Sequence, residues 1–179
     1  MAEAGSKGLV MVFTGAGKGK TTAAMGMALR AVGHGIRVLM IQFIKGGWRY
    51  GELEAGKKLE PDFELIPMGK GFIRFDRGGP APEDVQAVHE AWALFKERMA
   101  SKQYGMIILD EINNVVDYGL LPVEELLAGI RAKPAELHLV LTGRNAHPKV
   151  VERADLVTEM KEIKHPFQQG VKAQKGVEF

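Results

Sequence analysis

A glycine-rich turn near the amino end constrains the fold more than any other stretch of this sequence. Residues 14–22 read Thr-Gly-Ala-Gly-Lys-Gly-Lys-Thr-Thr. They follow an apolar run, residues 9–13, and lead into an alanine- and methionine-rich segment, residues 23–32. A strand, a glycine-rich turn and a helix in this order form a phosphate-binding loop. We therefore predict that residues 14–22, called the phosphate loop below, bind the phosphates of a nucleotide.

The phosphate loop contains the backbone and side-chain groups that phosphate binding needs. Glycines let backbone N–H groups point at an anion, and the start of a helix adds positive partial charge. Lys20 is expected to reach the terminal phosphates, and the Thr21 hydroxyl to hold a magnesium ion. The usual pattern has glycine where this chain has Thr14, and the alternative is a turn that only caps a helix. The predicted nucleotide-binding residues are Gly15, Ala16, Gly17, Lys18, Gly19, Lys20, Thr21 and Thr22.

Composition indicates one soluble domain and excludes several classes of protein. The 179 residues are 46% hydrophobic and carry a formal net charge of +2, too small to favour nucleic acid or a membrane surface. Because the chain has no cysteine, it has no disulfide, thiolate metal site or cysteine nucleophile, and any reduction needs an external electron donor. Residues 1–7 form a polar extension without the apolar core of a signal peptide, and no apolar run reaches membrane-spanning length. A cytosolic location is expected.

Strand and helix signals alternate along residues 1–179, which predicts a single α/β domain with a mostly parallel sheet of about six strands flanked by helices. Residues 44–59 read mostly as loop with room for a short helix, and residues 67–80 as loop. The predicted strands are residues 9–13, 37–43, 63–66, 106–109, 137–141 and 156–160. The predicted helices are residues 20–32, 82–99, 122–131 and 148–154.

An apolar strand that ends in Asp110 and Glu111 is the second chemical signal. Phosphate-loop proteins bring carboxylates to a metal ion in this way. Consecutive strand residues point to opposite faces, so one carboxylate is expected to meet the metal while neighbouring groups hold the other. Thr21, Asp110 and Glu111 are therefore the predicted magnesium ligands. Arg144 follows another strand at the same edge, where such folds bind ligands, and is either a nucleotide contact or a surface residue.

Aromatic residues are spread among the glycines of residues 45–80. Either they pack beneath a long loop, or together they line a wide cleft for a flat, bulky ligand. Periodicity does not decide between these interpretations. The residues concerned are Trp48, Tyr50, Phe63, Phe72 and Phe75.

Several segments, in the right order, resemble those of ATP:corrinoid adenosyltransferases, and together they cover nearly the whole chain. The family also accounts for Thr14, because its phosphate loop commonly carries this threonine. The segments are residues 13–22, 42–46, 68–72, 109–111, 141–144 and the tail 164–176.

The resemblance implies a phosphate-loop (RecA-like) fold in which cobalt(I) of a reduced corrinoid attacks the 5′ carbon of ATP. Triphosphate then leaves, with the nucleotide bound in a reversed sense relative to ordinary phosphate-loop ATPases. No protein base is required, so Lys20, Thr21 and Glu111 with Mg²⁺ or Mn²⁺ are expected to stabilise the leaving group. The resemblance further implies adenosylcobalamin synthesis or corrinoid salvage, an electron donor of the flavin or flavodoxin type, a homodimer and a tail (residues 162–179) near the active site.

In this family a phenylalanine and, two residues later, a tryptophan contact the lower face of the corrin. Phe72 matches the phenylalanine, whereas Arg74 stands at the tryptophan position and Phe75 follows it. Phe72, Phe75 and Trp48 are therefore the expected corrinoid contacts. Two other classes stay open: a phosphate-loop ATPase or kinase that releases ADP, and a regulatory or nucleic-acid-binding module related to recombination ATPases.

Overall fold

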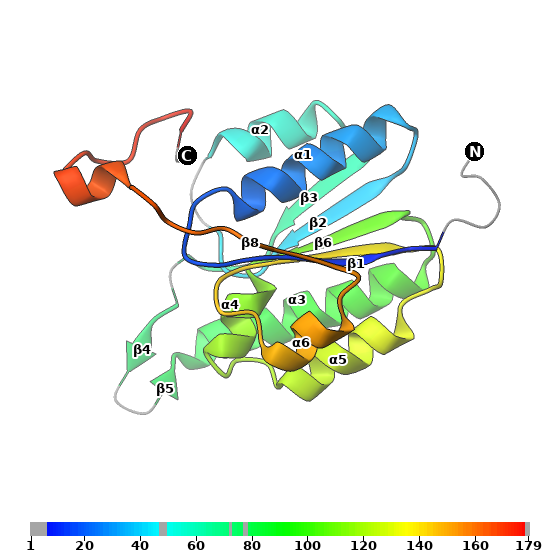
Figure 1. Cartoon of the computed structure of the whole chain (residues 1–179). Coiled ribbons are helices and arrows are strands. Elements are labelled where there is room, and N and C mark those ends of the chain that lie inside the picture. The colour runs from blue at the N-terminus through cyan, green and yellow to red at the C-terminus, as the bar shows by residue number, and fades with distance from the viewer. Residues whose placement is uncertain (1–6, 47–49, 72, 77–78, 178–179) are drawn as a thin grey trace.

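The structure is a computed structural model that describes residues 7–46, 50–71, 73–76 and 79–177. One sheet of six parallel strands runs in the order β3–β2–β6–β7–β1–β8 (Figure 1). The prediction of a single α/β domain with a six-stranded parallel sheet is thus confirmed for the fold. The strands are β1 (Val10–Thr14), β2 (Val38–Gln42), β3 (Phe63–Pro67), β6 (Met106–Asp110), β7 (His138–Thr142) and β8 (Leu156–Glu159).

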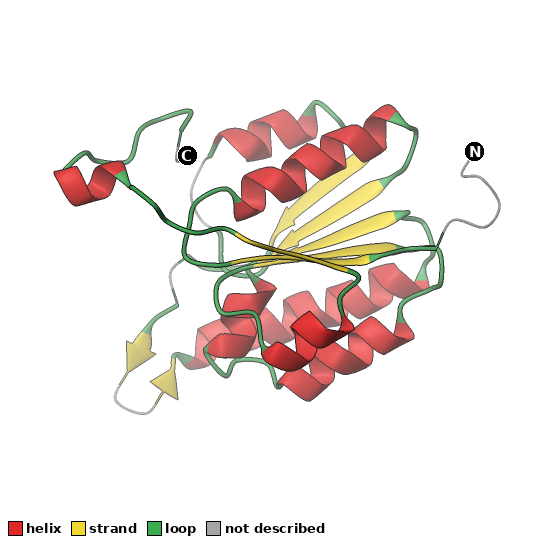
Figure 2. Ribbon diagram, viewed as in Figure 1, coloured by secondary structure: helices red, strands yellow, loops and turns green. Residues whose placement is uncertain are grey.

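Helices cover both faces of the sheet, as Figure 2 shows. α1 and α2 lie on one face, and α3, α4, α5 and α6 lie on the other. Their bounds, with those of a short 3-10 helix in the tail, are α1 (Lys20–Gly33), α2 (Gly51–Lys57), α3 (Pro82–Ala100), α4 (Ile112–Asp117), α5 (Val123–Ala132), α6 (Pro148–Arg153) and η1 (Pro166–Gln169). No helix among these described elements combines the length and the apolar composition that a membrane crossing needs.

Because helices cover both faces, the central strands β1, β2, β6 and β7 are mostly apolar and almost entirely buried, rather than alternating between apolar and polar residues. In β1, Val10 and Val12 pack into the core on the α3 side, whereas Met11 and Phe13 pack into the core beneath α1. This alternation is the period of two that a strand imposes on its side chains. A buried strand of this kind holds the phosphate loop at a fixed place at the edge of the sheet.

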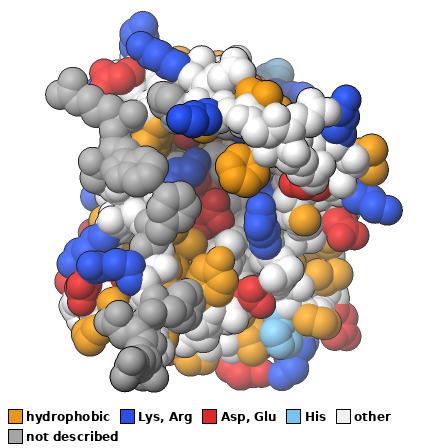
Figure 3. Space-filling view, turned by 90° about the vertical axis from the view of Figure 1, so that its left-hand side faces the viewer, with side chains coloured by type: hydrophobic (Ala, Val, Ile, Leu, Met, Phe, Trp, Pro, Cys, Tyr) orange, Lys and Arg blue, Asp and Glu red, His pale blue; other side chains and the backbone are white. Residues whose placement is uncertain are grey.

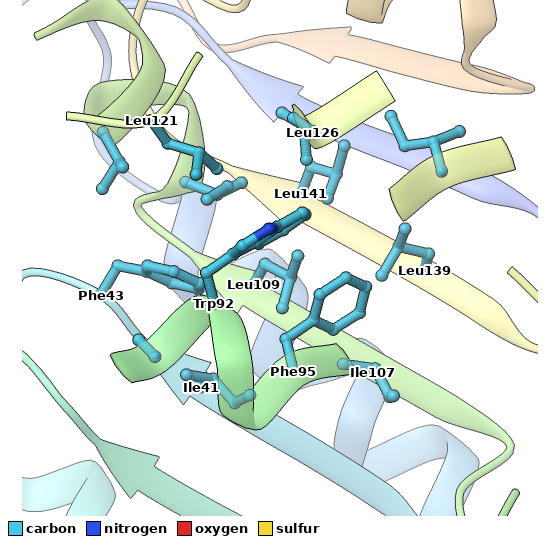
Figure 4. Close-up of a cluster of buried hydrophobic side chains, with 14 of the residues drawn as sticks. Ile41, Phe43, Trp92, Phe95, Ile107, Leu109, Leu121, Leu126, Leu139 and Leu141 are labelled. Carbon is cyan, nitrogen blue, oxygen red and sulfur yellow. The ribbon is translucent and has the colours of Figure 1, made fainter. Parts of the chain in front are cut away.

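The larger core lies between the sheet and α3, where Trp92 and Phe95 pack over the side chains of the central strands (Figure 4). The two rings are tilted by 37° with centroids 4.9 Å apart. Gly129 of α5 allows the close approach of this helix, because a Cβ there would lie 2.7 Å from the Trp92 ring. Apolar residues of α3 at helical spacing thus cover one face of the sheet.

Register brings polar residues together at the carboxyl edge of the sheet. Gln42, the last residue of β2, pairs with Asp110 at the end of β6. Phe13 of β1 pairs with Thr142 at the end of β7. Since all these strands are parallel, the loops that follow them meet at this one edge, where ligands of open α/β sheets bind.

Two small features were not predicted. α4 begins directly after the acid pair, and a short hairpin of β4 (Phe75–Asp76) and β5 (Gly79–Pro80) interrupts the loop before α3. The hairpin lies at the same end of the sheet as the phosphate loop, on the α3 side (Figure 1). Both elements are too short to show helical or strand periodicity in the sequence.

Candidate nucleotide-binding site

The phosphate loop has the backbone shape that its glycines permit. β1 ends at Thr14 and α1 begins at Lys20, with Gly15 at φ 97° and Gly19 at φ 112° in between. These values lie in the left-handed region that favours glycine. Among the described residues, no side chain caps the first turn of α1, so its N–H groups are left for an anion.

The chain that follows β8 crosses directly over the phosphate loop. The N–H of Met160 donates to the carbonyl of Thr14 at 2.8 Å, and the N–H of Gly17 donates to the carbonyl of Met160 at 2.7 Å. A Cβ on Gly15 would lie 2.4 Å from the Met160 carbonyl oxygen, and one on Gly17 would lie 2.8 Å from it. Backbone packing therefore requires glycine at both positions. Residues 160–161 are called the crossing segment below.

Thr14 has a structural reason to replace the glycine of the usual pattern. Its Oγ1 accepts a hydrogen bond of 3.1 Å from the N–H of Ala146, in the loop that follows β7. Glycine could not accept this bond. The threonine thus ties the phosphate loop to the neighbouring loop that contains Arg144.

Lys20 folds back over its own loop. Its Nζ donates to the carbonyl oxygens of Gly15 at 2.8 Å and Gly17 at 2.7 Å. Burial lowers the pKa of Lys20 below its ordinary value, Glu111 opposes this shift, and Arg144 adds to it. The ammonium group thus stands where a phosphate could replace the two carbonyls as its partner.

Asp110 is fully buried and held by several donors. Its Oδ1 accepts from the hydroxyls of Thr21 at 2.9 Å and Thr142 at 2.6 Å. Its Oδ2 accepts from Nε2 of Gln42 at 3.1 Å, with Nζ of Lys45 at 3.9 Å. A carboxylate accepts about four hydrogen bonds, so most of its capacity is already used by the protein.

Glu111 occupies a different environment from its neighbour. It is the N-cap of α4 with φ 67°, and its N–H donates to Oγ1 of Thr142 at 2.9 Å. Burial raises the pKa of Glu111, the adjacent Asp110 raises it further, and Lys45 and Lys20 act in the opposite direction. A left-handed backbone at a non-glycine residue is unusual, and here it lies at the junction of β6 and α4.

A cavity of about 440 Å³ lies beside the phosphate loop. Figure 3 looks at this end of the molecule, where lysine and acidic side chains meet around a hollow. The lining contains both basic and acidic side chains, which suits a ligand that brings both phosphates and a cation. The lining residues are Lys18, Gly19, Lys20, Thr21, Thr22, Met25, Lys45, Gly51, Glu52, Glu111, Gly176 and Val177.

The structure brings most of the predicted nucleotide residues together around this cavity. Ala16 is exposed. Arg144 is not among the lining residues; its N–H donates to Oδ1 of Asn114 at 2.7 Å, and its charge reaches Lys20. Gly176 and Val177 of the tail reach the same cavity.

The predicted corrinoid contacts are described only in part. Trp48 and Phe72 lie outside the described residues, and Phe75 is described by its backbone, which pairs with Pro80 in the β4–β5 hairpin. Tyr50 and Phe63 are buried, so these two do not line an open cleft, and Phe63 belongs to the core beneath α1.

Sequence reasoning missed Lys45, Glu52, Gln42 and Thr142 as site residues. Lys45 and Glu52 both line the cavity and form an ion pair, with Nζ of Lys45 3.2 Å from Oε1 of Glu52. Gln42 and Thr142 are fully or almost fully buried at strand ends beside Asp110. Gln42 and Thr142 could have been found because each is a polar residue at the carboxyl end of an apolar strand. Burying a polar side chain there is costly unless it has a hydrogen-bond partner.

The donor set at Thr21 fits a magnesium ion. Thr21 gives its hydroxyl hydrogen to Asp110, which leaves oxygen lone pairs for a cation, and the Glu111 carboxylate lines the same cavity. Magnesium is usually bound by one or two carboxylates, waters and substrate phosphates rather than by an all-protein cage. The described part of the chain has no group of three or more histidine or acidic residues placed to hold a metal.

Comparisons with known proteins agree with one another. A family model described as ATP:corrinoid adenosyltransferase BtuR/CobO/CobP matches residues 6–179. The chain is 41% identical over 175 residues to a corrinoid adenosyltransferase of Pseudomonas aeruginosa, covering 97% of this chain and 84% of that protein. It is 41% identical over 174 residues to the corrinoid adenosyltransferase CobA of Salmonella typhimurium, covering 97% and 86%.

Solved structures with a similar fold have low sequence identity. The flagellar accessory protein FlaH of Methanocaldococcus jannaschii superposes with a TM-score of 0.58 at 13% identity, covering 86% of this chain and 71% of that one. The RadB recombinase superposes with a TM-score of 0.57 at 15% identity, covering 90% and 78%. At such identities the likeness shows the fold alone.

Proposed function

This chain belongs to the ATP:corrinoid adenosyltransferase family, whose reaction is the ATP-dependent adenosylation of corrinoids in cobalamin biosynthesis or salvage, and on that premise we propose how its own residues act. ATP binds in the cavity with its triphosphate on the phosphate loop. Cobalt(I) of the reduced corrinoid attacks the 5′ carbon, the bond from this carbon to the phosphate oxygen breaks, and triphosphate leaves. The observation that carries this proposal is the cavity in which Lys18, Lys20 and Lys45 converge beside free helix N–H groups.

Stabilisation of the leaving group is the main task of the protein in this proposal. A cobalt(I) nucleophile needs no base, so the barrier is lowered by positioning and by donors aimed at the developing charge. We propose that Lys20 exchanges the carbonyls of Gly15 and Gly17 for phosphate oxygens when ATP binds. Nζ of Lys20 lies 2.8 Å from the Gly15 carbonyl oxygen and 2.7 Å from that of Gly17. A phosphate oxygen that took the place of either carbonyl would be within hydrogen-bond distance of Nζ.

The proposed metal is Mg²⁺ or Mn²⁺, held by Thr21 and Glu111 together with the phosphates. When bound, the ion supplies positive charge that neutralises part of the departing triphosphate. Asp110 was predicted as a third ligand. Because its oxygens already accept three hydrogen bonds, we propose that Asp110 instead holds Thr21 in place.

For the corrinoid, we propose contacts from Trp48, Phe72 and Phe75, as the family resemblance implies. Support comes from Arg74, whose N–H donates to Oδ2 of the buried Asp84 at 3.0 Å. This bond anchors Arg74, which lies between Phe72 and Phe75 in the sequence, to the first turn of α3.

Three further proposals follow from the family. The electron that reduces cobalt comes from an external donor of the flavin or flavodoxin type, since the chain has no cysteine. The protein acts as a homodimer in the cytosol. The outer strand β8, whose residues are all exposed, offers a surface for such a contact, and light scattering of the purified protein tests the dimer.

Adenosylation by single variants tests the proposed role of the phosphate loop. Under nitrogen, the protein is mixed with ATP, Mg²⁺ and chemically reduced cobalamin, and the light-sensitive cobalt–carbon product is followed by its absorbance. Lys20→Ala is expected to lower kcat by at least ~10²-fold, as the loss of one transition-state donor does. Lys57→Ala, an exposed lysine of α2, is the control and should leave the rate unchanged. Equal rates in the two variants would contradict the role of Lys20.

One observation favours a second candidate, ATP hydrolysis to ADP. Glu111 has a raised pKa and lines the cavity, as a carboxylate that activates water would. Glu111→Gln distinguishes the two functions. In an ATPase it would abolish ADP release, whereas in the adenosyltransferase the attacking cobalt needs no base and product formation should persist with weaker metal binding.

A further inference from the structure

The side chain of Tyr50 points into the protein rather than toward a ligand cleft. Tyr50 is 9% exposed and stands directly before α2. Its hydroxyl donates to Oε1 of Gln42 at 2.7 Å, and Nε2 of Gln42 donates to Oδ2 of Asp110 at 3.1 Å. A chain of two hydrogen bonds thus runs from the loop before α2 to the carboxylate at the centre of the site.

This chain of hydrogen bonds has a fixed direction. An ionised carboxylate only accepts, so the NH₂ group of Gln42 must face Asp110 and its carbonyl must face Tyr50. The phenol therefore has to be the donor. Burial raises the pKa of Tyr50 to about 12, and Glu52 and Asp110 add to the shift. The phenol consequently keeps its hydrogen throughout the neutral range.

The other oxygen of Asp110 controls the hydroxyl of Thr21. Oδ1 accepts from Thr21 at 2.9 Å and from Thr142 at 2.6 Å. With its hydrogen turned to Asp110, Thr21 presents only oxygen lone pairs to the cavity. If the carboxylate rotated, the Thr21 hydroxyl would lose its acceptor and could turn its hydrogen toward a bound cation.

We propose that Tyr50 is a positioning residue of the nucleotide site, which acts through Gln42 to hold Asp110 in the orientation that turns the Thr21 hydroxyl hydrogen away from the cavity. The proposal rests on the metal at Thr21 given above. Without the phenol hydroxyl, the buried Gln42 carbonyl lacks its donor, and the amide can invert and present its oxygen to Asp110. A buried carbonyl left without a hydrogen-bond donor costs free energy, so removal of the phenol hydroxyl destabilises the arrangement of Gln42 and Asp110.

Substitution of Tyr50 by phenylalanine removes only the hydroxyl. The ring stays in place beneath Lys45, whose Nζ lies 5.6 Å from the ring centroid. The matched control is Tyr104→Phe. The Tyr104 hydroxyl also donates to a side chain, Glu64, and Tyr104 is 6% exposed, but it precedes β6 at the opposite edge of the sheet.

Calorimetric titration with ATP, once with Mg²⁺ and once with EDTA, is the test. For Tyr50→Phe the Kd of Mg-ATP should rise about tenfold, which corresponds to one lost hydrogen bond. The Kd of ATP in EDTA should stay within about twofold, because the phosphate loop itself is untouched. Tyr104→Phe should change neither value. Equal losses with and without Mg²⁺, or no loss at all in Tyr50→Phe, would overturn the proposal.

A second variant keeps the test decisive if Tyr50→Phe folds poorly. Gln42→Met interrupts the relay at its middle residue and should give the same Mg²⁺-specific defect. The double variant should be no worse than Gln42→Met alone, since both changes break one relay; additive losses would contradict it. Wild-type protein that binds ATP equally with Mg²⁺ and EDTA would instead refute the metal site at Thr21, a failure of the proposed function that is distinct from a failure of the relay.

Discussion

Gly17→Ala separates two reasons for a glycine in the phosphate loop: approach of a phosphate, and approach of the crossing segment. Gly17 has no left-handed φ, so alanine is not strained by backbone conformation. Its Cβ would, however, lie 2.8 Å from the carbonyl oxygen of Met160 and from the carbonyl carbon of Lys161. Both are backbone atoms, so no side-chain rotation can relieve the overlap.

The cost follows from what must move. Displacing the crossing segment breaks the 2.7 Å hydrogen bond from Gly17 to Met160, worth about 1 kcal/mol. Overpacking adds roughly 1–3 kcal/mol, and the smaller conformational freedom of alanine in the unfolded chain offsets about 0.4–1 kcal/mol. The net loss is about 1–3.5 kcal/mol, which for a chain of this size lowers Tm by roughly 2–14 °C.

The assay is thermal unfolding without nucleotide, followed by circular dichroism. Gly26→Ala in α1 is the control, because a Cβ there meets no described atom within 4 Å, and alanine in a helix interior should stabilise by about 0.5–1 kcal/mol. If Gly17→Ala kept or raised the wild-type Tm while losing ATP affinity, the glycine would serve phosphate alone. That result would refute the packing argument.

Two further changes test other parts of the site. Thr14→Val leaves the Ala146 N–H without its acceptor and should lower the free energy of unfolding by about 1–2 kcal/mol, whereas Thr14→Ser should keep the bond and most of the stability; equal losses would contradict this role of the hydroxyl. Glu111→Gln should be more stable than wild type at neutral pH. The folded protein favours the protonated form of Glu111, because the folded-state pKa is raised. The protonated carboxyl therefore contributes stability below the ordinary pKa of 4.5, and this contribution is lost as pH rises through the folded-state pKa. Denaturant unfolding should therefore show the advantage of the variant vanish below pH 4.5, and an advantage that is constant with pH would contradict the assigned shift.

The fold could be predicted wherever a sequence pattern was long enough to show its period. Residues of α3 such as Val88, Trp92 and Phe95 recur at helical spacing, and all three are buried. α4 has only six residues, and its N-cap is Glu111 at φ 67°. It is therefore too short to show helical periodicity, and it lacks the serine, threonine, asparagine or aspartate that usually marks the start of a helix. Asp84 in the first turn of α3 is buried and accepts a hydrogen bond from the N–H of Arg74, a contact between two elements that helical periodicity does not predict.

The candidate site divides in the same way. The phosphate loop and the acid pair are contiguous in sequence, so their chemistry could be read directly from residue types and spacing. Thr14 and Ala146 are 132 residues apart, and Gln42 and Asp110 are 68 apart. These contacts depend on which strands are neighbours in the sheet and in what register. The order β2–β6–β7–β1 fixes the neighbours, and the pairing of the strands fixes the register, with Gln42 opposite Asp110. Single-sequence patterns specify neither.

The most direct test of the central claim is the identity of the phosphate product. The protein, ATP and Mg²⁺ are mixed with a limiting amount of chemically reduced cobalamin under nitrogen, and the phosphorus products are resolved by ³¹P NMR after the cobalt–carbon bonds have been counted by absorbance. The account predicts tripolyphosphate in an amount equal to the cobalt–carbon bonds formed, without ADP. Release of ADP, or tripolyphosphate that does not scale with the corrinoid supplied, would contradict it.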